Sequence, residues 1–133
     1  MVDCKPMAIP LVSNWRNIDT SRSDRFDPTL YCQLIGLIMY LVNTRPDISF
    51  AVNSLSQFMV DNRRVHWTAA KHILRYIRGT VEYGLVYERK GNVHLASFTD
   101  VDWEGCVEDQ KSTSGCCFNI GSGVISWFNG KQK

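Results

Sequence analysis

The run VHWTAAKHILRYIRG, residues 65–79, decides the fold, because the hydrophobic pattern of the chain changes where this run ends. Before Gly79, apolar residues recur at the three- and four-residue spacing of a helix, and after it they follow the pattern of strands. Gly79 is expected to end the helix, in the left-handed conformation that glycine favours at this position. Because helices come first and strands follow, the sequence predicts an α+β fold, or fragments of two different domains.

Three helices are expected in the first part of the chain. The first should cover residues 28–42, with Asp27 as its N-cap and a proline at its first position. The second should cover residues 46–60, again opened by a proline, with Thr44 or the residue after it as cap. The third should cover residues 65–78. The apolar positions that recur at helical spacing in the first helix are Leu30, Leu34, Leu37, Ile38 and Leu41.

The second part of the chain is expected to form a small antiparallel β-meander. A compact turn at residues 121–123, Gly-Ser-Gly, predicts a hairpin between the last two strands. The domain organisation that follows is an extended arm, a helical part and a β part, at residues 1–26, 27–80 and 81–133. The strands are expected at Leu85–Tyr87, Val93–Asp102, Gly115–Ile120 and Val124–Phe128.

Composition sets the class of protein. The chain has 133 residues, 44% of them hydrophobic, and a formal net charge of +2, so it can form a core and has no global charge that selects nucleic acid or a membrane. No apolar run reaches membrane-spanning length. The N-terminus lacks the pattern of a secretory signal, and the five cysteines form no C-x-x-C pair. We therefore expect an intracellular protein with reduced thiols, no bound metal and no cofactor.

Two acidic residues, Asp100 and Asp102, stand on an expected strand, where aspartate is rare. Residues two apart on a strand share one face of the sheet, so the two carboxylates could be part of a metal site. A two-metal site needs more carboxylates than these two to balance the charge of its ions and fix their geometry. The pair alone is therefore expected to supply at most half of such a site.

A basic face is expected on the third helix. Four cationic residues fall within about a 60° sector beside its apolar face, and no acidic residue lies between Asp61 and Glu82. Such a face can follow a phosphate backbone, so weak binding of nucleic acid is one interpretation. A solvated helix surface with extended side chains is the other. The four residues are Arg64, Lys71, Arg75 and Arg78.

Motifs along the whole chain resemble one family, the Pol polyproteins of copia-type retrotransposons. They occur in the family's order and at its spacing, in both the helical and the β part. They are Tyr31-x-x-Leu34-Ile35-Gly36, Thr44-Arg45-Pro46-Asp47-Ile48, Phe50-Ala51-Val52, His66-x-x-Ala69-Ala70-Lys71, Leu74-Arg75-Tyr76, Arg78-Gly79-Thr80, Thr99-Asp100-x-Asp102-Trp103-x-Gly105, Lys111-Ser112-Thr113-Ser114-Gly115 and Ile125-Ser126-Trp127.

The resemblance implies that the helical part corresponds to the C-terminal end of the reverse transcriptase and the β part to the start of ribonuclease H, as a truncated sheet. It also implies that Asp100 matches the first metal-ligating aspartate of ribonuclease H, so that Asp100, with Asp102 beside it, is expected to be a vestigial metal ligand. The polymerase hairpin Tyr-x-Asp-Asp does not occur in this chain, and the remaining ribonuclease H carboxylates of the family lie downstream of residue 133. We therefore expect a fragment that is not an enzyme.

Short chains of this kind also resemble proteins named secreted RxLR effectors of oomycete plant pathogens. That resemblance implies a protein secreted and then active in the host cell, with a plant protein as partner, that suppresses immunity and cell death. The targeting motif is degenerate here, because Arg22 and Arg25 enclose Ser-Asp and not the expected leucine. Effector function is therefore the alternative to a Pol fragment.

Overall fold

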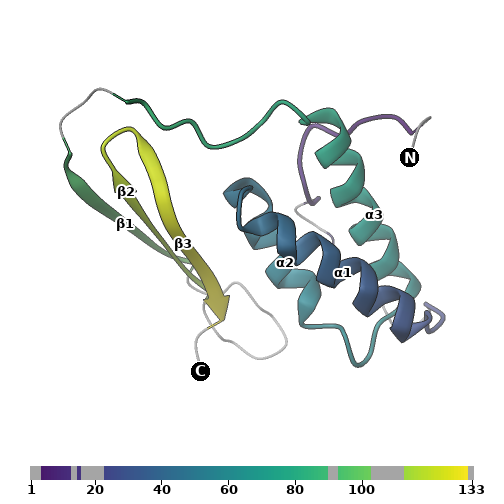
Figure 1. Cartoon of the computed structure of the whole chain (residues 1–133). Coiled ribbons are helices and arrows are strands. Elements are labelled where there is room, and N and C mark those ends of the chain that lie inside the picture. Colours follow the sequence, from purple (N-terminus) through teal and green to yellow (C-terminus); the bar gives the residue numbers. More distant parts are fainter. Residues whose placement is uncertain (1–3, 13–14, 16–22, 90–92, 103–112, 132–133) are drawn as a thin grey trace. The chain divides into compact units, whose positions relative to one another are not determined.

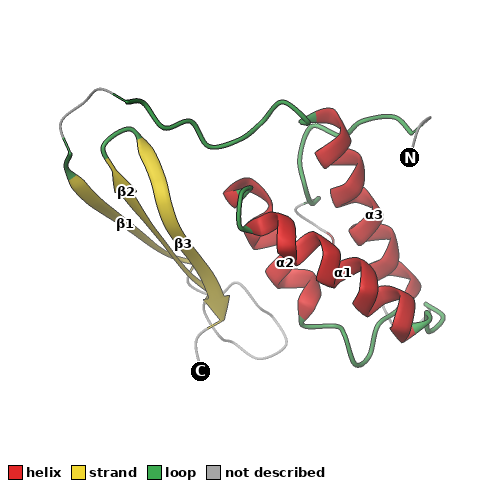
Figure 2. Cartoon of the chain, viewed as in Figure 1, coloured by secondary structure: helices red, strands yellow, loops and turns green. Residues whose placement is uncertain are grey.

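A computed structural model describes residues 4–12, 15, 23–89, 93–102 and 113–131. The chain divides into two compact units, Met1–Tyr83 and Gly84–Lys133. The first unit is helical and the second carries a three-stranded antiparallel sheet (Figures 1 and 2). This arrangement confirms the predicted α+β fold of three α-helices followed by a small β-meander.

Helix α1 covers Pro28–Val42, as the sequence predicts. The carboxylate of Asp27 caps it, because Asp27 Oδ1 accepts hydrogen bonds from the backbone N–H groups of Thr29 (2.8 Å) and Leu30 (3.3 Å). These two bonds satisfy donors that have no partner within the first turn of a helix. The cap and the proline at position 28 together fix where α1 begins.

The second helix is shorter than predicted. Pro46 opens a single 3-10 turn, Pro46–Ile48, and α2 follows as Ser49–Ser56, so the expected end near residue 60 is wrong. Of the two expected caps, Arg45 occupies the N-cap position without a side-chain capping bond, whereas Thr44 Oγ1 donates to the carbonyl of Leu41. The segment after α2 still contributes to the core, because the Phe58 ring stacks on His66 at a centroid distance of 4.0 Å.

Helix α3 covers Arg64–Gly79 and ends as predicted, but for a different reason. Gly79 does not adopt the left-handed conformation; within the described residues, Gly121 is the glycine with positive φ. A Cβ atom at Gly79 would lie 2.8 Å from Cβ of Pro6, closer than real Cβ atoms approach. Glycine is therefore required here by the close passage of the N-terminal segment.

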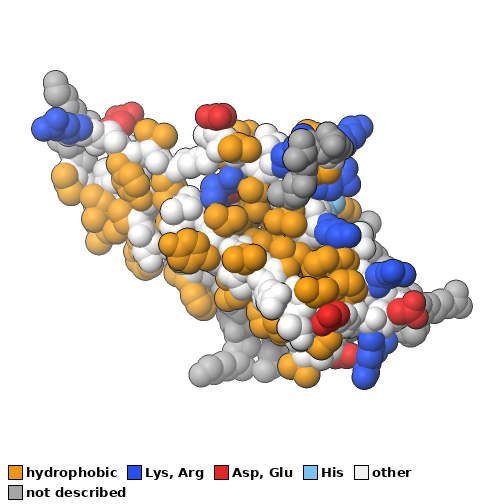
Figure 3. All heavy atoms as spheres, turned by 45° about the vertical axis from the view of Figure 1, so that its right-hand side comes forward, with side chains coloured by type: hydrophobic (Ala, Val, Ile, Leu, Met, Phe, Trp, Pro, Cys, Tyr) orange, Lys and Arg blue, Asp and Glu red, His pale blue; other side chains and the backbone are white. Residues whose placement is uncertain are grey.

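The core of the helical unit lies between α1, α2 and α3, with Trp15 of the N-terminal segment beside them. The Tyr31 hydroxyl is buried and donates to the carbonyl of Leu55 at 2.8 Å, and burial raises the pKa of this phenol. In α1 the buried residues are Tyr31, Ile35 and Ile38. Of the five apolar positions that recur at helical spacing in α1, three are exposed, namely Leu30, Leu37 and Leu41. Hydrophobic side chains lie open on the surface that Figure 3 shows.

The sheet of the second unit has the order β1-β2-β3, with β1 at Leu95–Asp102, β2 at Thr113–Ile120 and β3 at Gly123–Lys131. The hairpin between β2 and β3 turns at residues 121–122, where Gly121 has φ 57°. The strand predicted at residues 85–87 does not form. Instead, the Tyr87 ring lies over Gly123 and its hydroxyl donates to the carbonyl of Val124 at 2.6 Å.

Candidate nucleic-acid interface on helix α3

The four predicted cationic residues stand on α3, but the structure separates them into two pairs. Arg64 and Lys71, in the first half of the helix, are exposed. Lys71 Nζ lies 5.4 Å from the centroid of the Trp67 ring, a cation–π contact that leaves the ammonium group open to solvent. Arg75 and Arg78, in the second half, are only partly exposed. The two halves of the basic face therefore differ in their access to a ligand.

Arg75 and Arg78 are bound by a segment that we call the strap, residues 4–11. Arg75 Nε donates to the carbonyl of Lys5 at 2.7 Å, and Arg78 Nη1 donates to the carbonyl of Cys4. In the opposite direction, the N–H of Met7 donates to the carbonyl of Arg75 at 3.4 Å. The extended arm predicted from the sequence is thus fixed to α3 along its described residues.

Two further contacts complete the strap. His72 Nε2 donates to the carbonyl of Ile9 at 3.0 Å, because a carbonyl can only accept. Arg78 Nη1 also lies 3.4 Å from Cys4 Sγ, and this hydrogen bond lowers the pKa of the Cys4 thiol against the smaller opposing effect of burial. The side chains of α3 that face the strap are therefore donors, and the strap presents mainly carbonyl acceptors.

An open cavity of about 540 Å³, which no sequence pattern predicted, lies between α3 and the N-terminal residues from the end of the strap onward. Its walls are mostly apolar, with Leu11, Val12 and Trp15 on one side and Val65 and Ala69 of α3 on another. The guanidinium-bearing Arg64 is also among its lining residues. The cavity places apolar surface directly beside the exposed cations of the interface.

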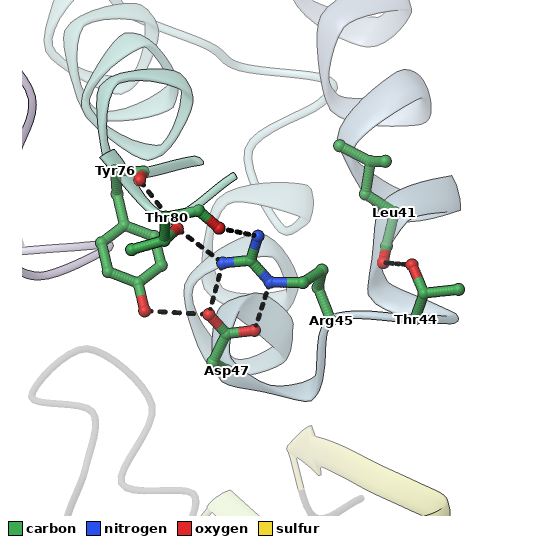
Figure 4. Close-up of polar contacts among 6 residues, drawn as sticks. All are labelled: Leu41, Thr44, Arg45, Asp47, Tyr76 and Thr80. Carbon is green, nitrogen blue, oxygen red and sulfur yellow. Dashed lines mark hydrogen bonds and ion pairs between the residues drawn. The ribbon is translucent and has the colours of Figure 1, made fainter. Parts of the chain in front are cut away.

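A polar network that sequence reasoning missed ties the start of α2 to the end of α3 (Figure 4). Arg45, 8% exposed, forms a bidentate pair with Asp47, with Nε–Oδ1 and Nη2–Oδ2 distances of 2.9 and 2.7 Å. Its Nη1 donates to the carbonyl of Thr80 at 3.0 Å, and the Tyr76 hydroxyl donates to Asp47 at 2.8 Å. The motif Thr44–Ile48, noted above for its family resemblance, was the available signal.

The protonation of this network follows from its contacts. The hydrogen bond from Arg45, and with a smaller effect that from Tyr76, holds the pKa of the Asp47 carboxyl below its ordinary value, while burial opposes the shift. Burial, followed by the bond to Asp47, raises the pKa of the Tyr76 phenol. At neutral pH the network therefore consists of a charged pair and a neutral phenol donor. It engages both carboxylate oxygens of Asp47 in contacts within the helical unit.

The acidic strand is β1, where Asp100 is exposed and stands opposite Gly115 of β2. The backbone of Asp102 belongs to the same strand, but its side chain lies outside the described residues. Within the part of the chain that the structure describes, no group of three histidine, cysteine or acidic residues could hold a metal ion. The vestigial role of Asp100 stays a prediction.

The degenerate targeting pair is only half described, because Arg22 lies outside the described residues. Arg25 forms an antiparallel bridge with Arg63, and its side chain is 3.7 Å from the exposed carboxylate of Asp61. This ion pair is at the surface and contributes little to stability. The structure thus gives Arg25 a local contact without testing a role in targeting.

Comparison with known proteins decides the family. The Retrovirus-related Pol polyprotein from transposon RE2 of Arabidopsis thaliana is 38% identical over 133 residues, which is all of this chain and 9% of the polyprotein. The chain belongs to the copia-type Pol family. A second Pol polyprotein of this family, from the tobacco transposon TNT 1-94, is 34% identical over a 145-residue alignment. No family model matches the chain, and no solved structure matches it.

Shorter proteins also match this copia-type Pol segment. An uncharacterized mitochondrial protein of Arabidopsis thaliana is 37% identical over 132 residues, 99% of the chain and 55% of that protein. A Plasmopara viticola protein named Secreted RxLR effector protein 161 is 46% identical over 104 residues, 77% of the chain and 73% of that protein. The chain therefore spans a small part of the polyproteins and about half of the mitochondrial relative. Among the described helices, none is long and apolar enough to cross a membrane.

Proposed function

We propose that the chain is a non-catalytic copia-type Pol segment that binds nucleic acid weakly through the first half of α3. The observation that carries the proposal is the exposure of Arg64 and Lys71 on a helix that contains no acidic residue. Two exposed cations on a helix free of acidic residues attract a phosphate backbone of any sequence. The apolar cavity beside Arg64 supplies a surface on which sugar or base edges can pack.

The non-catalytic part of the proposal rests on how the described acidic residues are used. Asp27 caps α1, Asp47 is paired with Arg45, and Asp61 lies near Arg25 and Arg63. Metal-assisted cleavage of a phosphodiester needs several carboxylates converging on the ions. Asp100, exposed on β1, has no such described neighbours. These contacts support a segment that recognises nucleic acid without cleaving it.

Binding is tested with a fluorescent RNA–DNA hybrid, by anisotropy, at several salt concentrations. Each phosphate contact lowers the log–log salt slope by about 0.9, so two contacts predict a slope of about −2. The double variant Arg64→Ala, Lys71→Ala should lose most of the affinity for the hybrid, and most of the dependence of that affinity on salt. Arg89→Ala, which removes an exposed cation of the second unit, is the matched control. Unchanged affinity in the double variant contradicts the proposed interface.

Cleavage is tested separately, with the same hybrid in Mg²⁺ or Mn²⁺. We expect the hybrid to remain intact both when the protein is far less concentrated than the hybrid and when the two are equimolar. Asp100→Asn is the matched variant, since it removes the family's first metal-ligand position and leaves the strand backbone unchanged. Cleavage by the wild-type chain that disappears in Asp100→Asn would show a working nuclease and overturn the non-catalytic proposal.

Effector function is the second candidate, and the match to the Plasmopara viticola protein favours it. Under this hypothesis the chain acts inside a plant cell and suppresses immunity and cell death through a host protein. The test is transient expression in leaves, scored by elicitor-triggered cell death. Suppression that persists in the Arg64→Ala, Lys71→Ala variant favours a protein partner over nucleic acid. Equal cell death with and without the chain removes this candidate.

A further inference from the structure

We propose that the strap is an intramolecular competitor for nucleic acid, which occupies Arg75 and Arg78 and so limits the contact with a polyanion to Arg64 and Lys71 until the strap is released from α3. This inference rests on the proposed nucleic-acid function and extends it to regulation. It starts from the division of the basic face into an exposed pair and a pair bound by the strap. Displacement of the strap would double the number of cations available to phosphates.

The chemistry of the strap favours exchange. Arg75 and Arg78 donate to neutral main-chain carbonyls of Lys5 and Cys4, whereas phosphate oxygens carry charge. A phosphate adds a full negative charge and can accept two parallel hydrogen bonds from one guanidinium group, so it is a better acceptor for arginine than a single neutral carbonyl. The strap compensates by being covalently attached, which gives it a high effective concentration at α3.

The charge of the strap also favours its exchange for a polyanion. Residues 4–11 include Lys5 and no acidic residue, so the strap leaves the positive charge of Arg75 and Arg78 uncancelled. A polyanion approaching Arg64 and Lys71 is therefore still attracted by the covered pair. The prolines at positions 6 and 10 each fix their own φ angle, which lowers the backbone entropy that the strap loses each time it docks.

Gly79 provides a way to release the strap without touching the cations. It is the last residue of α3 and is exposed, and an added Cβ would lie 2.8 Å from Cβ of Pro6. Gly79→Leu keeps a helix-forming residue in α3 and forces Pro6 away. Pro6→Phe introduces bulk at the same contact from the side of the strap. Gly36→Leu is the matched control, because a Cβ there meets nothing within 4 Å.

Release of the strap is measured first, without nucleic acid. In the wild-type chain the hydrogen bond from Arg78 lowers the pKa of the Cys4 thiol, so alkylation of Cys4 should begin at lower pH than alkylation of a free thiol. Mass spectrometry locates the modified residue. We expect the pH profile of Cys4 to move upward in Gly79→Leu and Pro6→Phe and to stay in place in Gly36→Leu. A Cys4 profile unchanged in both strap variants overturns the proposal.

Hybrid binding is then compared across salt. With two contacts, raising salt from 50 to 200 mM should weaken binding about 12-fold, and with four contacts about 150-fold. The wild-type chain and Gly36→Leu should show the smaller loss, and the variants with released Cys4 the larger one. Adding Arg75→Ala and Arg78→Ala to Gly79→Leu should restore the smaller loss.

The possible outcomes distinguish a failure of the strap proposal from a failure of the proposed nucleic-acid interface. Released Cys4 with the salt dependence of the wild type overturns the strap proposal and leaves the interface of Arg64 and Lys71 standing. Absence of hybrid binding in both the wild-type and the released chains overturns the proposed function itself, and with it the regulatory role of the strap. The larger salt dependence, found only where Cys4 is released, supports both.

Discussion

The helical unit and the sheet unit differ in whether they complete their own core. In Met1–Tyr83, residues such as Ile35 and Leu55 are 0% exposed, because three helices and the N-terminal segment enclose them. In the described part of Gly84–Lys133, Gly123 is the one residue classed as buried, and Phe128 remains 62% exposed. One unit is held together by side-chain burial and the other mainly by backbone pairing.

The sheet exposes apolar side chains on both faces. Directly opposed residues share a face, so Leu95 and Ile120 mark one side of the sheet and Phe98 and Cys117 the other. Leu95 and Phe98 are both more than half exposed. A sheet of three strands with no cover is marginally stable. The difference from the helical unit teaches that apolar side chains stabilise a fold only where a second layer encloses them.

The largest expected difference between the units is the effect of removing one isoleucine from each. Ile35→Ala should destabilise the helical unit by about 3 kcal/mol, because it leaves a cavity in a close-packed core. Ile125→Ala should change stability by less than about 1 kcal/mol, because its side chain is already 46% exposed. Urea unfolding followed by circular dichroism at 222 nm measures both. Comparable losses in the two variants would break the comparison.

The polar network of the helical unit should give the next largest effect and a distinctive pH dependence. Asp47→Asn removes the charge that faces the buried Arg45, and we expect a loss of about 2 kcal/mol at pH 7. Because the folded-state pKa of Asp47 is lowered, its contribution is complete above the unfolded value near pH 4 and is lost as pH falls through the folded value.

Urea midpoints at pH 7 and at pH 3 test whether the contribution of Asp47 to stability falls with pH. The gap between the wild-type chain and Asp47→Asn should shrink at the lower pH, because pH 3 lies below the ordinary pKa of an aspartate and part of the contribution of the charged carboxylate to folding is lost there. Thr44→Ala is the control, since Thr44 makes only an exposed hydrogen bond to Leu41. A gap that is constant between the two pH values would show that Asp47 does not titrate as its contacts require.

The sequence predicted where helices and strands lie better than it predicted which of their sides are buried. The bounds of α1 could be predicted because Asp27 and Pro28 act locally, through a cap and a fixed φ angle. Its buried face could not, because α1 contains no charged residue and is apolar around most of its circumference. Which side is covered depends on where α2 and α3 lie. The structure therefore buries Tyr31 and leaves Leu37, 71% exposed, on the surface.

The candidate site shows the same limit. Spacing alone placed the four cations on one side of α3, since the helical repeat determines that. It could not reveal that Arg75 and Arg78 donate to a segment about seventy residues earlier in the chain. The role of Gly79 was misread for the same reason, because its constraint is the close approach of Pro6 and not its own φ angle. Long-range contacts, unlike caps and periodicity, leave no local pattern.

In the sheet unit, the hairpin turn should matter more than any exposed apolar side chain. Gly121 has φ 57°, and a side chain in this conformation costs about 1 kcal/mol. Gly121→Ala should therefore speed amide hydrogen exchange in β2 and β3 about fivefold while leaving α1 and α3 unchanged. Gly84→Ala, whose Cβ meets nothing within 4 Å, is the control. Equal effects on both units would show that they unfold together.

The smallest expected change in stability comes from the exposed aromatic residues of the sheet. Phe128→Thr should alter the free energy of unfolding by no more than about 0.5 kcal/mol, because Phe128 is mostly exposed and threonine also favours strands. The same substitution should lower the fluorescence of the dye ANS, which binds exposed apolar surface. Val60→Thr, at a position 96% exposed in the helical unit, is the control and should leave the signal unchanged. A wild-type chain that binds no ANS, or a Phe128→Thr variant that unfolds much more easily, would mean that the sheet is covered in solution, and the contrast between the two units would then disappear.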